Sequence, residues 1–169
     1  MNSIILRKEV IMIIFYIIAG IIVVIDQVVK YLTVQHIPLY ETVSAIPNIL
    51  SFTYHQNSGA AWSILEGQMW FFILVTIAVI GVICYYLQTQ GRQSLLFSSA
   101  LTLLLAGAFG NLIDRILNQY VVDMFRLEFV QFPIFNVADM SLTFGVGLMI
   151  VYLILDEIKT FKQKKAVKK

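Results

Sequence analysis

Charged residues are scarce in this sequence. Only 13% of its 169 residues are Asp, Glu, Lys or Arg, 59% belong to the hydrophobic set, and the mean hydropathy is +0.83. Soluble globular domains have about 25% charged residues and about 45–50% apolar ones. The composition therefore excludes a soluble globular domain and indicates a membrane protein.

Cysteine is almost absent as well, since Cys84 is the only one in the chain. A single cysteine cannot form an intramolecular disulfide, so the sequence excludes a disulfide framework and gives no indication of redox chemistry. Cys84 lies within an apolar run, where we expect a buried and inert thiol.

Several catalytic and binding motifs are also missing. The chain has no HExxH or other helix-spaced histidine pair, no G-x-S-x-G elbow and no phosphate-binding glycine motif. His55 and Ser58 lie close together in HQNSG, but without the elbow we interpret Ser58 as a turn residue, and His36 as a surface residue. We therefore expect neither a metal nor a cofactor.

Four apolar runs are long enough to cross a bilayer, whose hydrocarbon core of about 30 Å takes about 20 helical residues. The predicted helices cover about 10–30, 69–87, 94–114 and 137–156, within a single membrane domain, residues 1–169. The first run is not followed by a signal-peptide cleavage pattern, and Asp26, Gln27 and Lys30 continue its helical face. We therefore expect an uncleaved first helix.

The distribution of lysine and arginine predicts the orientation. Arg7, Lys8, Arg92 and the tail KTFKQKKAVKK fall on one side of a four-helix topology, whereas residues 31–68 contain no lysine or arginine. By the positive-inside rule both termini are cytoplasmic, and the two longer connections face outward. We expect the basic tail to contact anionic lipid headgroups and not nucleic acid.

With this topology the polar residues of the helices fall into one layer near the outer face. A carboxylate at membrane depth costs about 2.5–3.5 kcal/mol on insertion scales, so such residues usually face the interior of a helix bundle and usually have a function. The layer consists of Asp26 and Lys30 on the first helix, Asn111, Asp114 and Arg115 on the third, and Asn136 and Asp139 at the start of the fourth.

Helical spacing predicts how this layer packs. Gly107, Gly110, Asn111 and Asp114 give the third helix a face of small and polar residues. Asp139, Thr143 and Gly147 form a comparable stripe on the fourth helix, and we expect the two stripes to contact each other. Asp26 and Lys30 have the spacing of an intrahelical ion pair.

The outer connections differ in character from the helices. Pro38, Pro47 and short runs of Val, Ile, Thr and Tyr predict a small β element at about 32–62. Residues 119–135 are too short and too mixed to cross the membrane, and they predict a strand, a turn or a short helical lid. The aromatic residues Trp62, Trp70, Phe71 and Phe72 are typical of an interfacial belt.

The aspartates admit more than one interpretation. Asp26 can be half of a structural ion pair, Asp114 part of a polar knot, Asp123 a solvated loop acid, and Asp139 a helix cap. If the lid folds back, however, Asp123 and Asp139 meet at the mouth of the bundle. Two carboxylates in a poorly hydrated site share one proton, so one can activate water while the other protonates an amide. An ion-coupled transporter or other binding protein is the competing class.

Five sequence blocks together resemble the prolipoprotein signal peptidases, or signal peptidase II. They are DQVVK from Asp26, NSGAAW from Asn57, GNLIDR from Gly110, VVDMF from Val121 and FNVAD from Phe135, in the order of that family. The resemblance implies four transmembrane helices with a small extracytoplasmic β-cradle and an outer loop. The segment MFRLEF that begins at Met124 is the part we cannot match to the family.

The resemblance also implies a function. It is that of an aspartic endopeptidase of the bacterial cytoplasmic membrane, which removes the signal peptide of diacylglyceryl-modified prolipoproteins just before the lipidated cysteine. We expect a monomer, because one chain contains both acids. By this resemblance the catalytic acids are Asp123 and Asp139. The positions that hold substrate or a peptide inhibitor such as globomycin are Asn57, Asn111, Arg115 and Asn136, and the supporting positions are Asp26, Lys30 and Asp114.

Overall fold

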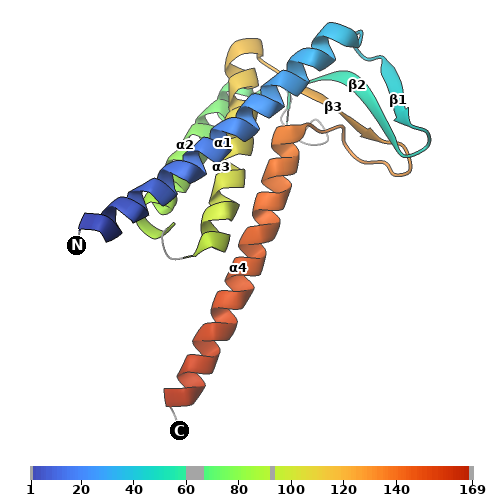
Figure 1. Ribbon diagram of the computed structural model, residues 1–169. Coiled ribbons are helices and arrows are strands. Elements are labelled where there is room, and N and C mark those ends of the chain that lie inside the picture. The colour runs from blue at the N-terminus through green and yellow to red at the C-terminus, as the bar shows by residue number, and fades with distance from the viewer. Residues whose placement is uncertain (1, 60–66, 92–93, 168–169) are drawn as a thin grey trace.

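The computed structural model describes residues 2–59, 67–91 and 94–167, with side chains from residue 12 onward. Four long helices and a small sheet make up the fold (Figure 1). The elements in chain order are α1 (Asn2–His36), β1 (Thr42–Ile46), β2 (Leu50–Asn57), α2 (Met69–Gln90), α3 (Leu95–Asn118), β3 (Val121–Leu127) and α4 (Val137–Val167).

All four helices are long and apolar enough to span a membrane, which confirms the multi-pass prediction. They differ in burial: 67% of the most apolar window of α3 is buried, against 11–22% for the other three. The central helix is therefore α3, and the apolar core lies where Phe15 of α1 and Leu87 of α2 pack near Leu101 and Leu105 of α3. Cys84 is only half-buried at the margin of this core.

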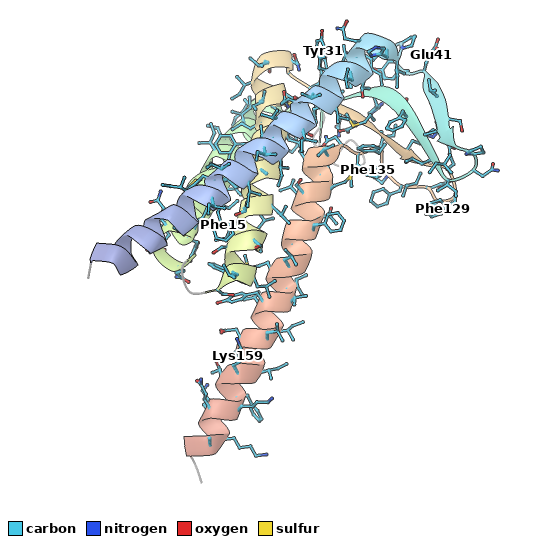
Figure 2. The ribbon with its side chains drawn as sticks, viewed as in Figure 1. Phe15, Tyr31, Glu41, Phe129, Phe135 and Lys159 are labelled. Carbon is cyan, nitrogen blue, oxygen red and sulfur yellow. The ribbon has the colours of Figure 1, made fainter. Side chains whose placement is uncertain are left out.

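The helices are longer than the apolar runs predicted. The prediction of β structure at 31–36 is wrong, because α1 continues to His36. The helix ends just before Pro38, whose ring disfavours helical backbone at the preceding residue. At the other end of the chain α4 continues to Val167, and Lys159 lies on the part of this helix that extends past the ends of α2 and α3 (Figure 2).

The sheet is antiparallel, with strand order β1-β2-β3. Asn48, at a φ of 61°, lies in the turn between β1 and β2, a conformation that asparagine tolerates better than most residues. β3 comes from the connection between α3 and α4, so it is the strand among the three forms predicted for residues 119–135. Backbone hydrogen bonds from Met124 and Phe125 to the Phe135 carbonyl, at 3.0 and 2.8 Å, then return the chain to α4.

Close packing of α3 on α4 depends on the glycines predicted on α3, whereas the stripe predicted on α4 is wrong at Thr143 and Gly147. A Cβ on Gly107 would lie 2.4 Å from the Ala138 carbonyl oxygen, and one on Gly110 would lie 2.9 Å from the Ala138 Cβ. On α4, however, Gly147 has no neighbour within 4 Å and Thr143 is exposed. Ala138 and Leu142 of α4 lie against Gly107 of α3, in place of the predicted Thr143 and Gly147.

The predicted aromatic belt is only partly visible. Trp62 lies outside the described residues, as does Arg92, one of the basic residues from which the membrane orientation is predicted. Trp70 is 62% exposed at the start of α2, next to the edge-on rings of Phe71 and Phe72. The position of these rings at the membrane interface stays a prediction.

Candidate active site

Two carboxyl groups border one cavity between the sheet and the helices. Asp123 lies on β3 and is 1% exposed, and Asp139 is half-buried in the first turn of α4. Both line a cavity of about 730 Å³ together with residues of α2, α3, α4 and the loop before α4. The fold thus brings together the two acids that the sequence predicted to meet.

Amide groups hold the carboxylate of Asp123 on both sides. Asn57 ends β2 opposite Val121, one pleat away from Asp123, and its Nδ2 donates to Asp123 Oδ2 at 3.0 Å. Asn136 Nδ2 donates to Asp123 Oδ1 at 2.7 Å. The pairing of β2 with β3 therefore carries one of the two donors to the acid, and the start of α4 carries the other.

Asp139 is held by its own helix and by α3. Asn136 precedes α4, and its Oδ1 accepts from the Asp139 backbone N–H at 2.8 Å, while Asp139 Oδ2 accepts from the Asn136 N–H at 3.2 Å. This reciprocal arrangement satisfies donors that the first helical turn leaves unpaired. Asn111 Nδ2, from α3, donates to Asp139 Oδ1 at 2.8 Å.

The electrostatics of the site favour a proton on Asp123. Burial and, after it, the negative charge of Asp139 raise the pKa of Asp123 to about 7, against the hydrogen bonds from Asn57 and Asn136 and the charge of Lys30. Desolvation penalises the charged form of a carboxyl group, and a nearby like charge adds to the penalty. At neutral pH the pair can therefore hold one proton and one negative charge.

The cavity combines this polar end with an apolar wall. Val75 and Val79 of α2 and Leu142 and Phe144 of α4 contribute apolar surface. Arg115 of α3 also lines the cavity, its guanidinium carbon 5.3 Å from the centre of the Phe72 ring. Among the described residues, Arg115 Nε is the one buried side-chain nitrogen or oxygen without a hydrogen-bond partner. A donor is thus left for an incoming molecule.

A charged cluster lies behind the two acids. Lys30 Nζ is 2.8 Å from Asp26 Oδ2, which confirms the predicted ion pair, and 3.1 Å from Asp114 Oδ2. The remaining carboxylate oxygen of Asp26 accepts from the Ala138 N–H at 2.8 Å, and Asp114 Oδ2 accepts from the Val122 N–H at 2.9 Å. The cluster of Asp26, Lys30 and Asp114 therefore joins α1 and α3 to β3 and to the start of α4.

The predicted site residues lie in one layer, and apart from Arg115 they form one connected network of hydrogen bonds and ion pairs. They are Asn57, Asp123, Asn136, Asp139, Asn111, Lys30, Asp26 and Asp114. The three asparagines, predicted to hold substrate, direct their amide donors at the two acids. Their role toward a substrate stays a prediction.

The sequence did not predict that two further residues, Gln27 and Phe72, lie at this site. Gln27 Nε2 donates to Asp114 Oδ1 at 3.0 Å and to the Gly110 carbonyl at 3.1 Å, so it bridges α1 and α3. Its position between Asp26 and Lys30 was the only sequence signal. Phe72 was assigned to an aromatic belt, whereas its ring lies against the guanidinium of Arg115.

Within the described ranges no three His, Cys, Asp or Glu side chains are grouped so that they could hold a metal ion. Asn57, Asn111 and Asn136 all present N–H groups to the carboxylates of the two acids. N–H donors suit a carboxyl group that is anionic or shares a proton, and they compete with a cation for the same oxygens.

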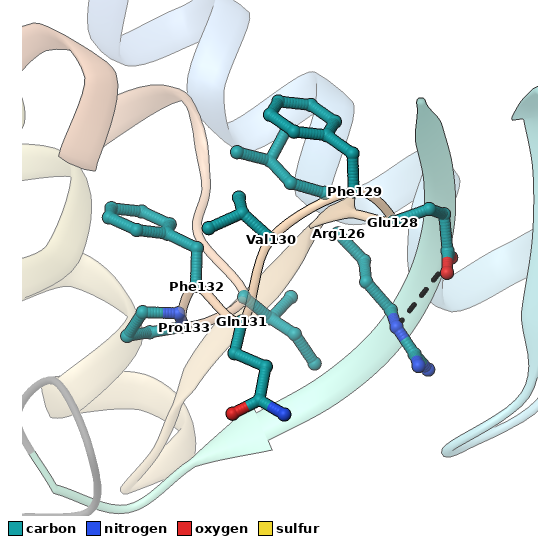
Figure 3. A pocket seen from close by; sticks show the side chains of 9 residues that line it. Arg126, Glu128, Phe129, Val130, Gln131, Phe132 and Pro133 are labelled. Carbon is teal, nitrogen blue, oxygen red and sulfur yellow. Dashed lines mark ion pairs between the residues drawn. The ribbon is translucent and has the colours of Figure 1, made fainter. Parts of the chain in front are cut away.

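A second hollow, of about 640 Å³, lies at the end of β3 and the loop that follows it. Residues 126–134 line this hollow (Figure 3). Arg126 Nε and Glu128 Oε1 are 3.6 Å apart across its outer side, where both side chains are partly exposed. Phe132 and Pro133 lie on the other side of the loop (Figure 3) and also line the main cavity. The loop therefore borders the site without adding a titratable group to the cavity wall.

Comparison with known proteins agrees with this geometry. The family model of Signal peptidase (SPase) II matches residues 18–155. The chain belongs to the signal peptidase II family. It is 47% identical over 148 residues to the lipoprotein signal peptidase of Listeria monocytogenes serovar 1/2a, covering 86% of this chain and 96% of the relative. It is 51% identical over 143 residues to that of Latilactobacillus sakei, covering 84% and 95%.

Solved structures of bacterial membrane enzymes share the fold of this chain. A bacterial membrane enzyme determined by the in meso method at 2.3 Å resolution aligns with a TM-score of 0.81 at 41% identity, over 85% of this chain and 88% of the other. A second such enzyme, determined at 1.9 Å, gives a TM-score of 0.77 over 82% and 91%. These two membrane enzymes therefore share with this chain a mostly helical fold with a small antiparallel sheet.

Proposed function

We propose that this chain is an aspartic endopeptidase that cleaves the signal peptide of diacylglyceryl-modified prolipoproteins on the N-terminal side of the lipidated cysteine. Its membership of the signal peptidase II family supports the cleavage of prolipoprotein signal peptides. The observation that carries the chemistry is that Asp123 and Asp139 border one cavity, where both are held by amide N–H donors. Metal and cofactor have no part in the reaction we propose.

The reaction needs one anionic and one protonated carboxyl group. The anionic acid takes a proton from a water molecule as the water attacks the scissile carbonyl, and the protonated acid supplies a proton to the developing oxyanion or the leaving amine. A pair whose charges repel in a buried site provides this combination, because both acids cannot ionise easily. The raised pKa of Asp123, about 7, supports the presence of such a proton at neutral pH.

We propose that Arg115 is the main donor to the backbone carbonyl groups of the substrate. Its Nε is buried and without a hydrogen-bond partner, and its guanidinium is fixed against Phe72. An extended peptide carries carbonyl groups that need donors in a poorly hydrated site. Asn57, Asn111 and Asn136 would assist if a bound peptide displaced one of their contacts with the acids. Globomycin, a peptide inhibitor, would compete for the same donors.

The proposed setting is the bacterial cytoplasmic membrane. We place both termini in the cytoplasm and the site near the extracytoplasmic face, because lysine and arginine concentrate at the opposite end of the helices from the two acids. We treat residues 1–169 as one peptidase domain that acts as a monomer, since one chain supplies both acids. Membrane lipids surround the exposed apolar faces of α1, α2 and α4.

The test is cleavage of a purified diacylglyceryl-modified prolipoprotein by the purified chain in detergent with EDTA. We expect cleavage by the parent, and a loss of about 10²-fold or more for Asp123→Asn and for Asp139→Asn, since each removes an acid or base. Asp156→Asn is the matched control, because Asp156 is an exposed acid on α4 outside the cavity. Cleavage that persists in either site variant would remove that residue from catalysis. A folded parent that binds the substrate without cutting it would indicate a binding or transport protein.

A further inference from the structure

The two acids of the site have different donors, and the difference can be traced back to Lys30. Lys30 Nζ contacts Asn111 Oδ1 at 3.1 Å, in addition to the carboxylates of Asp26 and Asp114. A lysine ammonium group can only donate hydrogen bonds. The amide of Asn111 must therefore present its oxygen to Lys30 and its Nδ2 to the opposite side.

On that opposite side lies Asp139. Asn111 Nδ2 donates to Asp139 Oδ1 at 2.8 Å, and Asn136 Nδ2 donates to Asn111 Oδ1 at 3.1 Å. If the Asn111 amide were rotated by half a turn, its NH₂ group would face the ammonium and the Asn136 amide, and its oxygen would face a carboxylate. Every contact would become unfavourable, so Lys30 and Asn136 together lock the donor onto Asp139.

The amides that reach Asp123 are oriented by backbone groups instead. Asn57 Oδ1 accepts from the Gly59 N–H at 3.0 Å, and Asn136 Oδ1 accepts from the Asp139 N–H at 2.8 Å, so that both Nδ2 groups point to Asp123. Neither of these amides contacts a charged donor. Asp139 also lies at the N-terminus of α4, where the helix dipole favours a negative charge. Asp139 is therefore the better place for the anion.

We propose that Lys30 is a positioning residue: by orienting the Asn111 amide it keeps Asp139 anionic, as the base that activates water, and leaves the proton on Asp123, as the acid. The kinetic part of this inference rests on the proposed function, whereas the location of the proton does not. The charged and titratable groups around the pair are Asp26 and Lys30 of α1, Asp114 and Arg115 of α3, and His55, which pairs with Asp123 across the sheet.

Isotope-edited infrared spectroscopy of the purified chain tests the location of the proton without any cleavage. At about pH 6, one unit below the pKa of Asp123, we expect the C=O stretch of a protonated carboxylic acid in the parent. Asp123→Asn should abolish this band and Asp139→Asn should retain it. The reverse pattern, or no protonated carboxyl band in the parent, would overturn the assignment.

A pair of variants tests the role of Lys30 itself. Lys30→Met alone would strand two buried carboxylates, so it is combined with Asp26→Asn, which leaves the net charge of the cluster at −1, as in the parent (Asp26, Lys30 and Asp114 sum to −1; Asp114 alone is −1). Asp26→Asn alone is the control that keeps Lys30 and its contact with Asn111.

The readouts are kcat, KM and their pH dependence for prolipoprotein cleavage. Relative to Asp26→Asn, the acidic limb of the pH–rate profile of the double variant should move up by about one unit, so kcat should fall by up to about tenfold at pH values on that limb and little above it, with little change in KM. Superimposable profiles, or an equal loss in kcat at every pH, would contradict the positioning role. If the double variant does not fold, the infrared comparison still decides the proton location. If the parent does not cleave, the proposed function fails while the infrared result stands.

Discussion

The polar layer at one end of the helix bundle contains two pairs of carboxyl groups that differ in what lies between them. Asp26 and Asp114 are 0% and 2% exposed, and Lys30 lies within 3.1 Å of both. Asp123 is just as buried, but within the described residues the hydrogen-bond partners of Asp123 and Asp139 are amide and backbone N–H groups. The first pair is compensated by a full charge and joins four elements. The second pair is left to share a proton, which is the state that acid–base chemistry requires.

The comparison explains why such similar residues differ in function. A buried acid with a lysine partner is paired with a full positive charge and holds backbone N–H groups, as Asp26 holds Ala138 and Asp114 holds Val122. A buried acid without a cation has a raised pKa, as Asp123 has. The cluster around Lys30 therefore holds β3 and the start of α4, the two elements that carry the acids we propose to be catalytic.

The largest expected effect is the loss of the cation from the compensated pair. Lys30→Met should destabilise the chain by about 3–5 kcal/mol, because breaking a buried ion pair leaves uncompensated charge. The measurement is the midpoint of unfolding in detergent. Asp26→Asn/Lys30→Met should recover much of this loss. Equal stability of Lys30→Met and the parent would show that water reaches the cluster and that the two pairs do not differ as described.

Glycine at position 110 allows the close approach on which the compensated pair depends. A Cβ there would lie 2.7 Å from Asp26 Oδ2 and 2.9 Å from the Ala138 Cβ. We expect Gly110→Ala to cost about 1–3 kcal/mol, as overpacking of a tight contact does. Gly147→Ala is the matched control, since Gly147 has no neighbour within 4 Å, and it should be neutral or slightly stabilising. Thermal unfolding of both variants measures these changes in stability. If Gly110→Ala were as stable as the parent, α1, α3 and α4 would pack less closely here than described.

The smallest expected effect is a gain in stability from removal of a reactive acid. The pKa of Asp123 is raised from 3.8 in an unfolded chain to about 7, so the folded state binds more protons than the unfolded state between these values. The contribution of this carboxyl group to stability is therefore fully present below about pH 4 and is lost as the pH rises through 7.

Asp123→Asn, which cannot ionise, should thus be more stable than the parent at about pH 8, by about 1–2 kcal/mol, and the difference should vanish near pH 4. Thermal unfolding of both proteins across this pH range measures the effect. A difference of the opposite sign, larger at high pH, would mean that the folded chain stabilises Asp123 as an anion.

Much of the architecture follows from the sequence, for identifiable reasons. The four membrane helices follow from apolar runs in which a span of about 20 residues leaves little alternative. The layer of polar residues follows from their positions at the helix ends, and the ion pair of Asp26 with Lys30 from four-residue spacing. The pairing of Asp123 with Asp139 as catalytic acids depended on the family resemblance and remains a prediction about roles, although both border one cavity.

Other features depend on contacts that local patterns do not encode. The pairing of β2 with β3 joins residues more than 60 positions apart, such as Asn57 with Val121, and it delivers an amide to Asp123. The face of α4 that packs against α3 was predicted incorrectly at Thr143 and Gly147, because Ala138 and Leu142 lie against Gly107 of α3 instead. The orientation of the Asn111 amide depends on Lys30 of another helix, so no local pattern predicts it.

The pH dependence of kcat for prolipoprotein cleavage by the parent, compared with Asp26→Asn, tests the distinction between the two pairs most directly. A pair that shares one proton predicts a bell-shaped profile, in which the alkaline limb falls as the Asp123 proton is lost near its pKa of about 7. Asp26→Asn should keep the bell shape, because the acid it replaces is compensated by Lys30. A parent profile without an alkaline limb, or a limb that disappears in Asp26→Asn, would contradict this division of the aspartates into a structural and a reactive pair.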